Sequence, residues 1–252
     1  MRLSDLVTQL SAHPGPALTW YGRDGARTEL GGPVVARWLA KTANLLGTEL
    51  AGDLFGEFPS PSGAARDAAA DSPVGFVRVD LGRSWQAVVW TAAAWLSGWR
   101  VIAPGSPDGS KGSSPDEGDA TVWVVASLDA AAVDAAESGV WVLAHDLAPL
   151  ALSWQGGPLP GGAMDALGEL MAQPDGLVVA PAVEWSTGEV RGSAQRVLLR
   201  AQDTPETARA VLAHWASGRA VVVVDTRDQD PAELDADALT EKIAEQERAE
   251  PI

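Results

Sequence analysis

A short polar segment, VEWSTGEVRG at residues 183–192, has the residue types that can hold a phosphate group. Glycines let the backbone approach an anion, hydroxyl groups donate hydrogen bonds to its oxygens, and a cation offsets its charge. The candidate nucleotide-binding residues are Ser186, Thr187, Gly188, Arg191 and Gly192. Glu189 and the bulky Trp185 oppose this interpretation, and Ser-Thr-Gly-Glu is also ordinary turn chemistry. The segment therefore predicts either a phosphate-binding loop or a turn between two strands.

The histidines give little support for metal or acid-base chemistry. His13, His145 and His214 lie far apart in the sequence, without the local spacing of metal ligands. His145 is followed by Asp146, which could form half of an acid-base pair, but no G-x-S-x-G nucleophile motif accompanies them. We therefore expect no metal site and assign no catalytic residue.

Two further segments follow predicted strands, where α/β proteins often bind ligands. Gly105, Gly109 and Lys111 invite comparison with the ATP-binding loop GxxxxGK[ST], but the spacing fails and glycine stands at position 112. Asp225 ends a strongly apolar strand, and we favour a cap on the turn before Asp228 over a ligand contact. Neither segment predicts a cofactor, so ATP or AMP at residues 183–192 is the one cofactor under consideration.

The composition restricts the choice of partner. The net charge of −16 would repel nucleic acid polymers and anionic membranes, so we expect a protein partner or a homo-oligomer. There is no cysteine, which fits a cytoplasmic protein and removes thiolate chemistry. The longest apolar run, residues 87–96, is far shorter than the ~20 residues of a membrane span. We expect no secretory signal either, because Asp5 interrupts the apolar run that it needs.

The apolar pattern predicts strands that alternate with helices. Strands are expected at residues 17–21, 26–30, 74–80, 99–104, 121–127, 140–144, 176–180, 195–200 and 220–225. The main helices are expected near the N-terminus, from Pro33, from Ser84 to Leu96, over 164–172, over 205–217 and from Asp230. A strand, a helix and a strand within residues 74–104 indicate a parallel crossover unit.

The fold class that follows is α/β: a doubly wound, mostly parallel sheet with flanking helices and a short N-terminal β-hairpin. We predict a single domain over residues 1–252, with two lobes at about 1–150 and 151–252 as a variant of it. Residues 51–73 and 105–119 are rich in Gly, Pro, Ser and Asp and are expected to form mobile loops.

The order of these elements resembles the adenylate-forming superfamily, which comprises acyl- and aryl-CoA ligases and peptide-synthetase adenylation domains. The hairpin and the helix with ARWLAKTANLL are similar to its entry segment, and VRVDLGRSWQAVVWTAAAWLSGWRVIAPG (77–105) is similar to its strand, helix and G-x-x-V-x-P segment. RVLL, the helix over 205–217 and GRAVVVVD resemble a later stretch of the same N-terminal portion. The match is to a truncated relative, of the kind found in a short actinobacterial family.

The resemblance implies that residues 186–192 correspond to the family's ATP-phosphate loop, STG-x-P-K-G. Here Val190 replaces the proline and Arg191 the lysine. The family's adenine and ribose motifs contain tyrosine, but Tyr21 is the sole tyrosine of this chain. We also expect the C-terminal lid domain with its catalytic lysine to be missing, since Lys242 lies outside the family's sequence context.

Three functional hypotheses follow. We favour an adenylate-forming-like protein that lacks ligase activity and acts as a binding or regulatory protein. The alternative is a residual binder of ATP, AMP or an acyl-adenylate, with an active acyl-activating ligase ranked below both. The third is an enzyme of another class, which would require an apolar pocket converging on His145 or Asp225.

Overall fold

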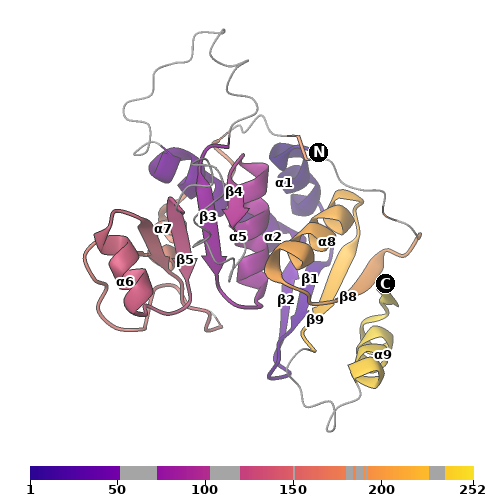
Figure 1. The fold of residues 1–252 in the computed structure, drawn as a ribbon. Coiled ribbons are helices and arrows are strands. Elements are labelled where there is room, and N and C mark those ends of the chain that lie inside the picture. Colours follow the sequence, from indigo (N-terminus) through magenta and orange to yellow (C-terminus); the bar gives the residue numbers. More distant parts are fainter. Residues whose placement is uncertain are drawn as a thin grey trace, which may run out of the picture. The chain divides into compact units, whose positions relative to one another are not determined.

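The computed structural model describes residues 1–51, 73–102, 120–149, 151–179, 184–185, 190, 192–226 and 236–252 (Figure 1). The chain divides into two compact units, each assembled from separate segments. Unit 1 contains Met1–Ala40, Gly82–Ala93 and Glu184–Ile252, and unit 2 contains Lys41–Leu81 and Ala94–Val183. Each unit holds one five-stranded sheet.

The sheet of unit 1 has the strand order β10-β8-β9-β1-β2. Its strands are β1 (Pro16–Tyr21), β2 (Arg27–Gly31), β8 (Arg196–Arg200), β9 (Ala220–Val224) and β10 (Glu250–Pro251). β1 and β2 form the predicted antiparallel hairpin, in which Trp20 lies opposite Thr28, whereas β1, β9, β8 and β10 pair in parallel. All five residues of β9 are buried, as expected for an uninterrupted β-branched strand inside a parallel sheet.

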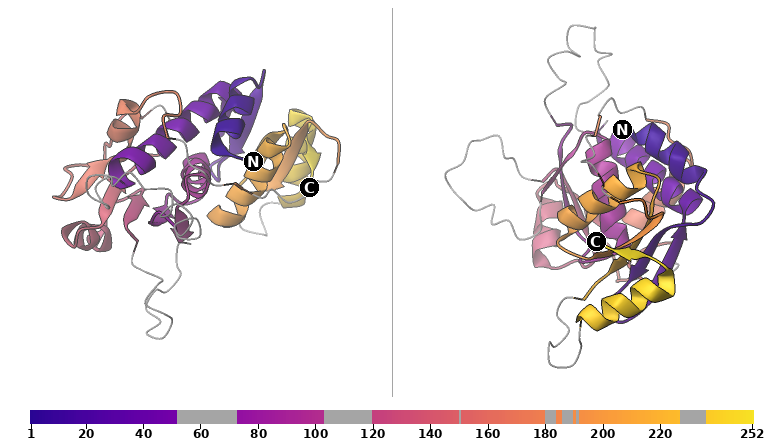
Figure 2. Two further views of the ribbon diagram at one scale, coloured as in Figure 1. Left: turned by 90° about the horizontal axis from the view of Figure 1, so that it is seen from above. Right: turned by 90° about the vertical axis from the view of Figure 1, so that its right-hand side faces the viewer.

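Helices cover both faces of this sheet. The chain moves from β8 to β9 through α8 (Thr204–Ala216) and returns past β8 to β10 after α9 (Ala236–Glu247). Because parallel crossovers are right-handed, connections that run in opposite directions place α8 and α9 on opposite faces (Figure 2). A third helix, α1 (Leu3–Ser11), also lies wholly within this unit and contacts α8.

Local signals explain where α8 begins and ends. The Asp203 carboxylate accepts a hydrogen bond of 2.8 Å from the Glu206 amide, and Pro205 occupies the first turn. Gly218 follows the helix with φ at 75°, a backbone angle that glycine adopts without strain. Trp215 is 1% exposed and donates through Nε1 to the Ala17 carbonyl at 3.0 Å, which fixes α8 to the start of β1.

The sheet of unit 2 is entirely parallel, with the order β4-β3-β5-β6-β7. Its strands are β3 (Phe76–Asp80), β4 (Arg100–Ile102), β5 (Val122–Val125), β6 (Trp141–Ala144) and β7 (Ala163–Asp165). The associated helices are α6 (Ala130–Glu137), α7 (Ala166–Ala172) and the π-helix η1 (Leu45–Leu50). Two longer helices, α2 (Gly32–Asn44) and α5 (Trp85–Leu96), have residues in both units. The parallel pairing of β3 with β4 confirms the predicted crossover unit.

The α/β class with its N-terminal hairpin is thus confirmed, and one strand prediction is wrong. Residues 176–179 are not a strand, because the Asn44 side chain satisfies their backbone: Nδ2 donates to Gly176 O and Oδ1 accepts from the Val178 amide, both at 2.9 Å. The predicted helix at 164–172 is confirmed as α7, but it begins two residues later, at Ala166. Asp165 ends β7 and caps the helix by accepting from the Leu167 amide.

Some predictions concern residues that the structure does not describe. The expected loop at 105–119 lies outside the described residues, and so does that at 51–73 except for its two end residues. Among the described residues, no helix is long and apolar enough to cross a membrane. The single-domain organisation and its two-lobe variant stay predictions.

Candidate functional site

The ends of the segment 183–192 are anchored by contacts within unit 1. Ser186, Thr187, Gly188 and Arg191 lie outside the described residues, so their part in phosphate binding stays a prediction. The Arg2 guanidinium pairs with Glu184 at 2.9 Å, with both side chains exposed. The N-terminal ammonium donates to the Trp185 carbonyl at 2.8 Å, and the Trp185 amide donates to Met1 O at 2.9 Å. The N-terminus therefore fixes the beginning of this segment.

Gly192 is the one predicted phosphate-binding residue within the described part of the chain. Its φ of 89° lies in the left-handed region, which glycine adopts without strain. The Arg219 guanidinium donates to its carbonyl, and a Cβ placed on Gly192 would lie 3.8 Å from the Glu250 Oε1. The end of the segment thus lies between the Glu250 carboxylate and the Arg219 guanidinium, which already donates a hydrogen bond to the Gly192 carbonyl.

Asp225 follows β9 and is buried at 6% exposure. Its amide donates to the Tyr21 carbonyl at 3.0 Å, which extends the pairing of β9 with β1, and its Oδ1 lies 3.3 Å from Arg83 Nη1. The structure therefore assigns Asp225 an ion-pair partner that sequence reasoning had not identified. Its predicted role as a turn cap before Asp228 stays a prediction, because Asp228 is outside the described residues.

A pocket of about 190 Å³ lies at this end of β9. Its described lining comes from the hairpin, the end of β9 and α9: Tyr21, Gly22, Gly25, Val224, Asp225, Leu239, Lys242, Ile243 and Gln246. The sequence signals for it were weak, because the three contributing segments are far apart and α9 reads as a polar surface helix. The apolar pocket that the third hypothesis requires at Asp225 is therefore present, although it lacks a recognisable catalytic constellation among its described residues.

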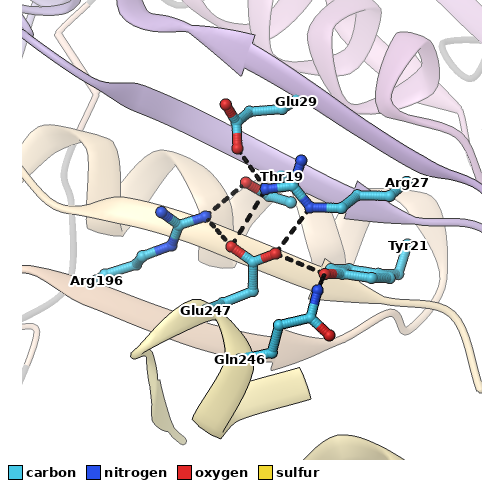
Figure 3. Close-up of polar contacts among 7 residues, drawn as sticks. All are labelled: Thr19, Tyr21, Arg27, Glu29, Arg196, Gln246 and Glu247. Atoms are coloured by element: carbon cyan, nitrogen blue, oxygen red, sulfur yellow. Dashed lines mark hydrogen bonds and ion pairs between the residues drawn. The ribbon is translucent and has the colours of Figure 1, made fainter. Parts of the chain in front are cut away.

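A buried carboxylate, Glu247 at the end of α9, lies next to this pocket and joins α9 to the sheet (Figure 3). Its side chain is 6% exposed and accepts from the Tyr21 hydroxyl at 2.5 Å, from Arg27 Nε at 2.8 Å and from Arg196 Nη2 at 2.6 Å. We call this group, completed by further contacts, the Glu247 cluster: Thr19, Tyr21, Arg27, Glu29, Arg196, Gln246 and Glu247.

The outer contacts of the Glu247 cluster hold its charged groups in place. Arg196 Nη2 also donates to Thr19 Oγ1 at 2.8 Å, and Arg27 pairs with Glu29. The Gln246 amide nitrogen donates to the Tyr21 hydroxyl at 3.3 Å. Two guanidinium groups, from Arg27 and Arg196, thus share one buried carboxylate, an arrangement that compensates the cost of removing the charge from water.

These contacts shift two pKa values. Hydrogen bonds from Arg27 lower the pKa of Glu247 below its ordinary value, despite the opposing effect of burial. Burial, followed by the hydrogen bond to Glu247, raises the pKa of Tyr21. Glu247 is therefore the charged partner, and Tyr21 remains a neutral hydrogen-bond donor at neutral pH.

The lowered pKa of Glu247 predicts that acid weakens the attachment of α9 to the sheet. The folded-state pKa lies below the unfolded value of about 4.5, so this carboxylate stabilises the fold above that value and loses its contribution as pH falls through the folded pKa. Urea unfolding of the wild type should show this decline, and Glu247→Gln should show a shallower one. Parallel pH profiles for the two proteins would contradict the assignment.

Two of the three histidines, His145 and His214, are buried. Burial lowers the pKa of His145, whose Nδ1 lies 2.9 Å from the Asp146 carbonyl, and burial with the nearby Arg219 lowers the pKa of His214. No group of three or more His, Cys, Asp or Glu residues in the described ranges is arranged to hold a metal ion.

Comparisons with known proteins bear on the fold. A scan against protein-family models found no match, and neither did a search of curated proteins. Among solved structures, an acyl-CoA synthetase from Brucella canis matches 99% of this chain and 46% of its own, with a TM-score of 0.58 and 16% identity. The amide bond synthetase McbA from Marinactinospora thermotolerans matches 98% of this chain and 47% of its own, with a TM-score of 0.51 and 16% identity.

A third structure extends the likeness to an adenylation domain. The McyG A-PCP protein complexed with phenylalanyl-adenylate matches 99% of this chain and 45% of its own, with a TM-score of 0.52 and 9% identity. The chain thus spans less than half the length of these three structures. At such identities the likeness establishes the fold alone: the chain has the α/β fold of adenylate-forming enzymes, over less than half of their length.

Proposed function

We propose that this chain is a cytoplasmic binding or regulatory protein that uses an adenylate-forming fold without ligase activity. Adenylation requires a site that gathers ATP and a carboxylate and stabilises the charge that develops at the α-phosphate. Such a site needs positive charge that is not already compensated by the protein. The contacts at the two ends of residues 183–192 bear on this requirement.

The observation that carries the proposal is that the two described cations at these ends, Arg2 and Arg219, already bind groups of the protein itself. Arg2 is paired with Glu184, and Arg219 donates to the Gly192 carbonyl with the Glu250 carboxylate nearby. Glu189 adds a further negative charge within the segment. A triphosphate would have to displace these contacts or accept neighbouring carboxylates, and both cost binding free energy.

A second function, residual binding of ATP, AMP or an acyl-adenylate, is favoured by the geometry of Gly192. Its left-handed φ gives the kind of bend that lets successive amides turn toward an anion. In this reading Ser186, Thr187, Gly188, Arg191 and Gly192 contact the phosphates, and an acyl-activating ligase would need the same contacts.

If the chain is a binding or regulatory protein, its proposed partner is another protein or a second copy of this chain. The net charge of −16 opposes nucleic acid polymers and anionic membranes. Electrostatics would then favour partners with basic surfaces, which provide complementary charge.

Pyrophosphate exchange tests the proposal directly. We expect the purified protein to exchange no labelled pyrophosphate into ATP with fatty, aromatic or amino acids, while an active acyl-CoA synthetase does so in the same assay. We also expect no heat on titration with ATP or AMP. Exchange that Arg191→Ala abolishes would overturn the proposal in favour of a ligase. Binding without exchange, weakened by the same substitution, would establish the residual nucleotide binder instead.

A further inference from the structure

The pocket between the hairpin, β9 and α9 has the size of a small-molecule site. Its volume of about 190 Å³ exceeds the roughly 150 Å³ of an engineered cavity that holds benzene, and is below the ~300 Å³ of drug-sized sites. It therefore suits one six-membered ring, or an aliphatic group of similar volume, with one small polar substituent. All of its described lining residues belong to unit 1.

The lining combines apolar walls with a polar rim. Val224, Leu239 and Ile243 offer aliphatic side chains to a ligand. Gly22 and Gly25 contribute backbone without a side chain, and Gly25 has a φ of 77°, which most other residues adopt at a cost. An apolar molecular body would fit against the aliphatic side, as in most small-molecule sites.

The carboxylates at the pocket and beside it are compensated by guanidinium groups. Asp225 lies 3.3 Å from Arg83, and Glu247 accepts from both Arg27 and Arg196. These ion pairs limit the repulsion that an anionic ligand would otherwise experience. These two carboxylates are therefore compensated by their arginine partners.

Lys242 is the cationic residue of the described pocket lining. Its side chain lines the pocket from the exposed side of α9, and it forms no ion pair with any residue that the structure describes. Glu241 and Glu245, its acidic neighbours on the same helix, are exposed and do not line the pocket. An ammonium group at the rim of an apolar pocket recognises an anion attached to an apolar body.

We infer that this pocket binds a small organic anion, with its apolar body against Val224, Leu239 and Ile243 and its acidic group at Lys242. This inference rests on the proposed binding function and gives it a site and a ligand class. Carboxylate, phosphate and sulfonate groups share the required chemistry, so the test compares them directly.

Titration calorimetry with benzoate, phenyl phosphate and benzenesulfonate, and with uncharged benzyl alcohol as reference, tests the ligand class. We expect at least one anion to bind at millimolar or lower concentration, and benzyl alcohol to bind about tenfold more weakly, the loss of one charge-assisted contact. Equal affinities for the anions and the alcohol would overturn the inference, and so would the absence of binding by all three anions.

Three variants locate the binding. Lys242→Gln should weaken the anion about tenfold, whereas Lys242→Arg should retain most of the affinity. Leu239→Trp should abolish binding by filling the pocket, and Glu241→Gln is the control on the same helix, outside the lining. Circular dichroism and a thermal melt show whether each variant is folded.

The outcome separates this inference from the broader function. Anion binding that survives both Lys242→Gln and Leu239→Trp would place the ligand elsewhere and overturn the inference, while a binding function would stand. Pyrophosphate exchange by the wild type would instead overturn the proposed function, whatever the pocket binds.

Discussion

Glu247→Ala is expected to lower the free energy of unfolding by about 3 kcal/mol, within the range for breaking one partner out of a buried ion pair. The substitution would leave the guanidinium groups of Arg27 and Arg196 and the Tyr21 hydroxyl without their shared acceptor. Arg27 and Arg196 are partly exposed, at 37% and 21% of their side-chain surfaces, so water limits the loss. The effect should fall first on α9, which this carboxylate attaches to the sheet.

Urea unfolding followed by tryptophan fluorescence measures this loss, and hydrogen exchange of the α9 amides locates it. Glu241→Ala is the matched control, because Glu241 is an exposed glutamate of the same helix. It should change the free energy of unfolding by less than about 0.5 kcal/mol, as usual for exposed sites. Equal effects of the two substitutions would show that the Glu247 cluster does not anchor α9.

Asn44→Ala is expected to destabilise unit 2 by about 1–3 kcal/mol. Asn44 is fully buried, and its amide satisfies the Gly176 carbonyl and the Val178 amide, which form no strand of their own. Removing the side chain breaks these two hydrogen bonds, each with a net worth of about 0.5–1.5 kcal/mol, because Gly176 and Val178 are exposed and water can replace part of the loss.

Chemical unfolding of the variant gives the size of this effect, and hydrogen exchange at Val178 gives its location. Gln202→Ala removes an exposed amide side chain and serves as the control. We expect faster exchange at Val178 in Asn44→Ala alone. Unchanged protection there would mean that the Asn44 side chain does not hold this segment.

The elements that were predicted correctly have strong local signals. AVVVV is long, β-branched and bounded by Gly218, so its assignment as a buried strand needed no tertiary information. The strand predicted at 176–180 has a similar apolar pattern, but a side chain more than 130 positions away, that of Asn44, satisfies its backbone. Strand β10 has two residues, too few for any periodicity to be detected.

The candidate site was predicted less well because its parts meet only in the folded chain. Tyr21 and Glu247 are 226 positions apart, and neither lies within a sequence motif. The polar pattern of α9 indicates a surface helix, and this pattern cannot distinguish a carboxylate in water from one buried between two arginines. Lys242 likewise reads as an ordinary surface lysine until the pocket beside it is known.

Tyr21 is the sole tyrosine of the chain, and its hydroxyl donates directly to the carboxylate that anchors α9. Fluorinated tyrosine incorporated during expression would therefore give one ¹⁹F resonance, free of overlap, from the junction of hairpin and terminal helix. Detachment of α9 would break the hydrogen bond between Tyr21 and Glu247, so the chemical shift of this resonance would report it directly.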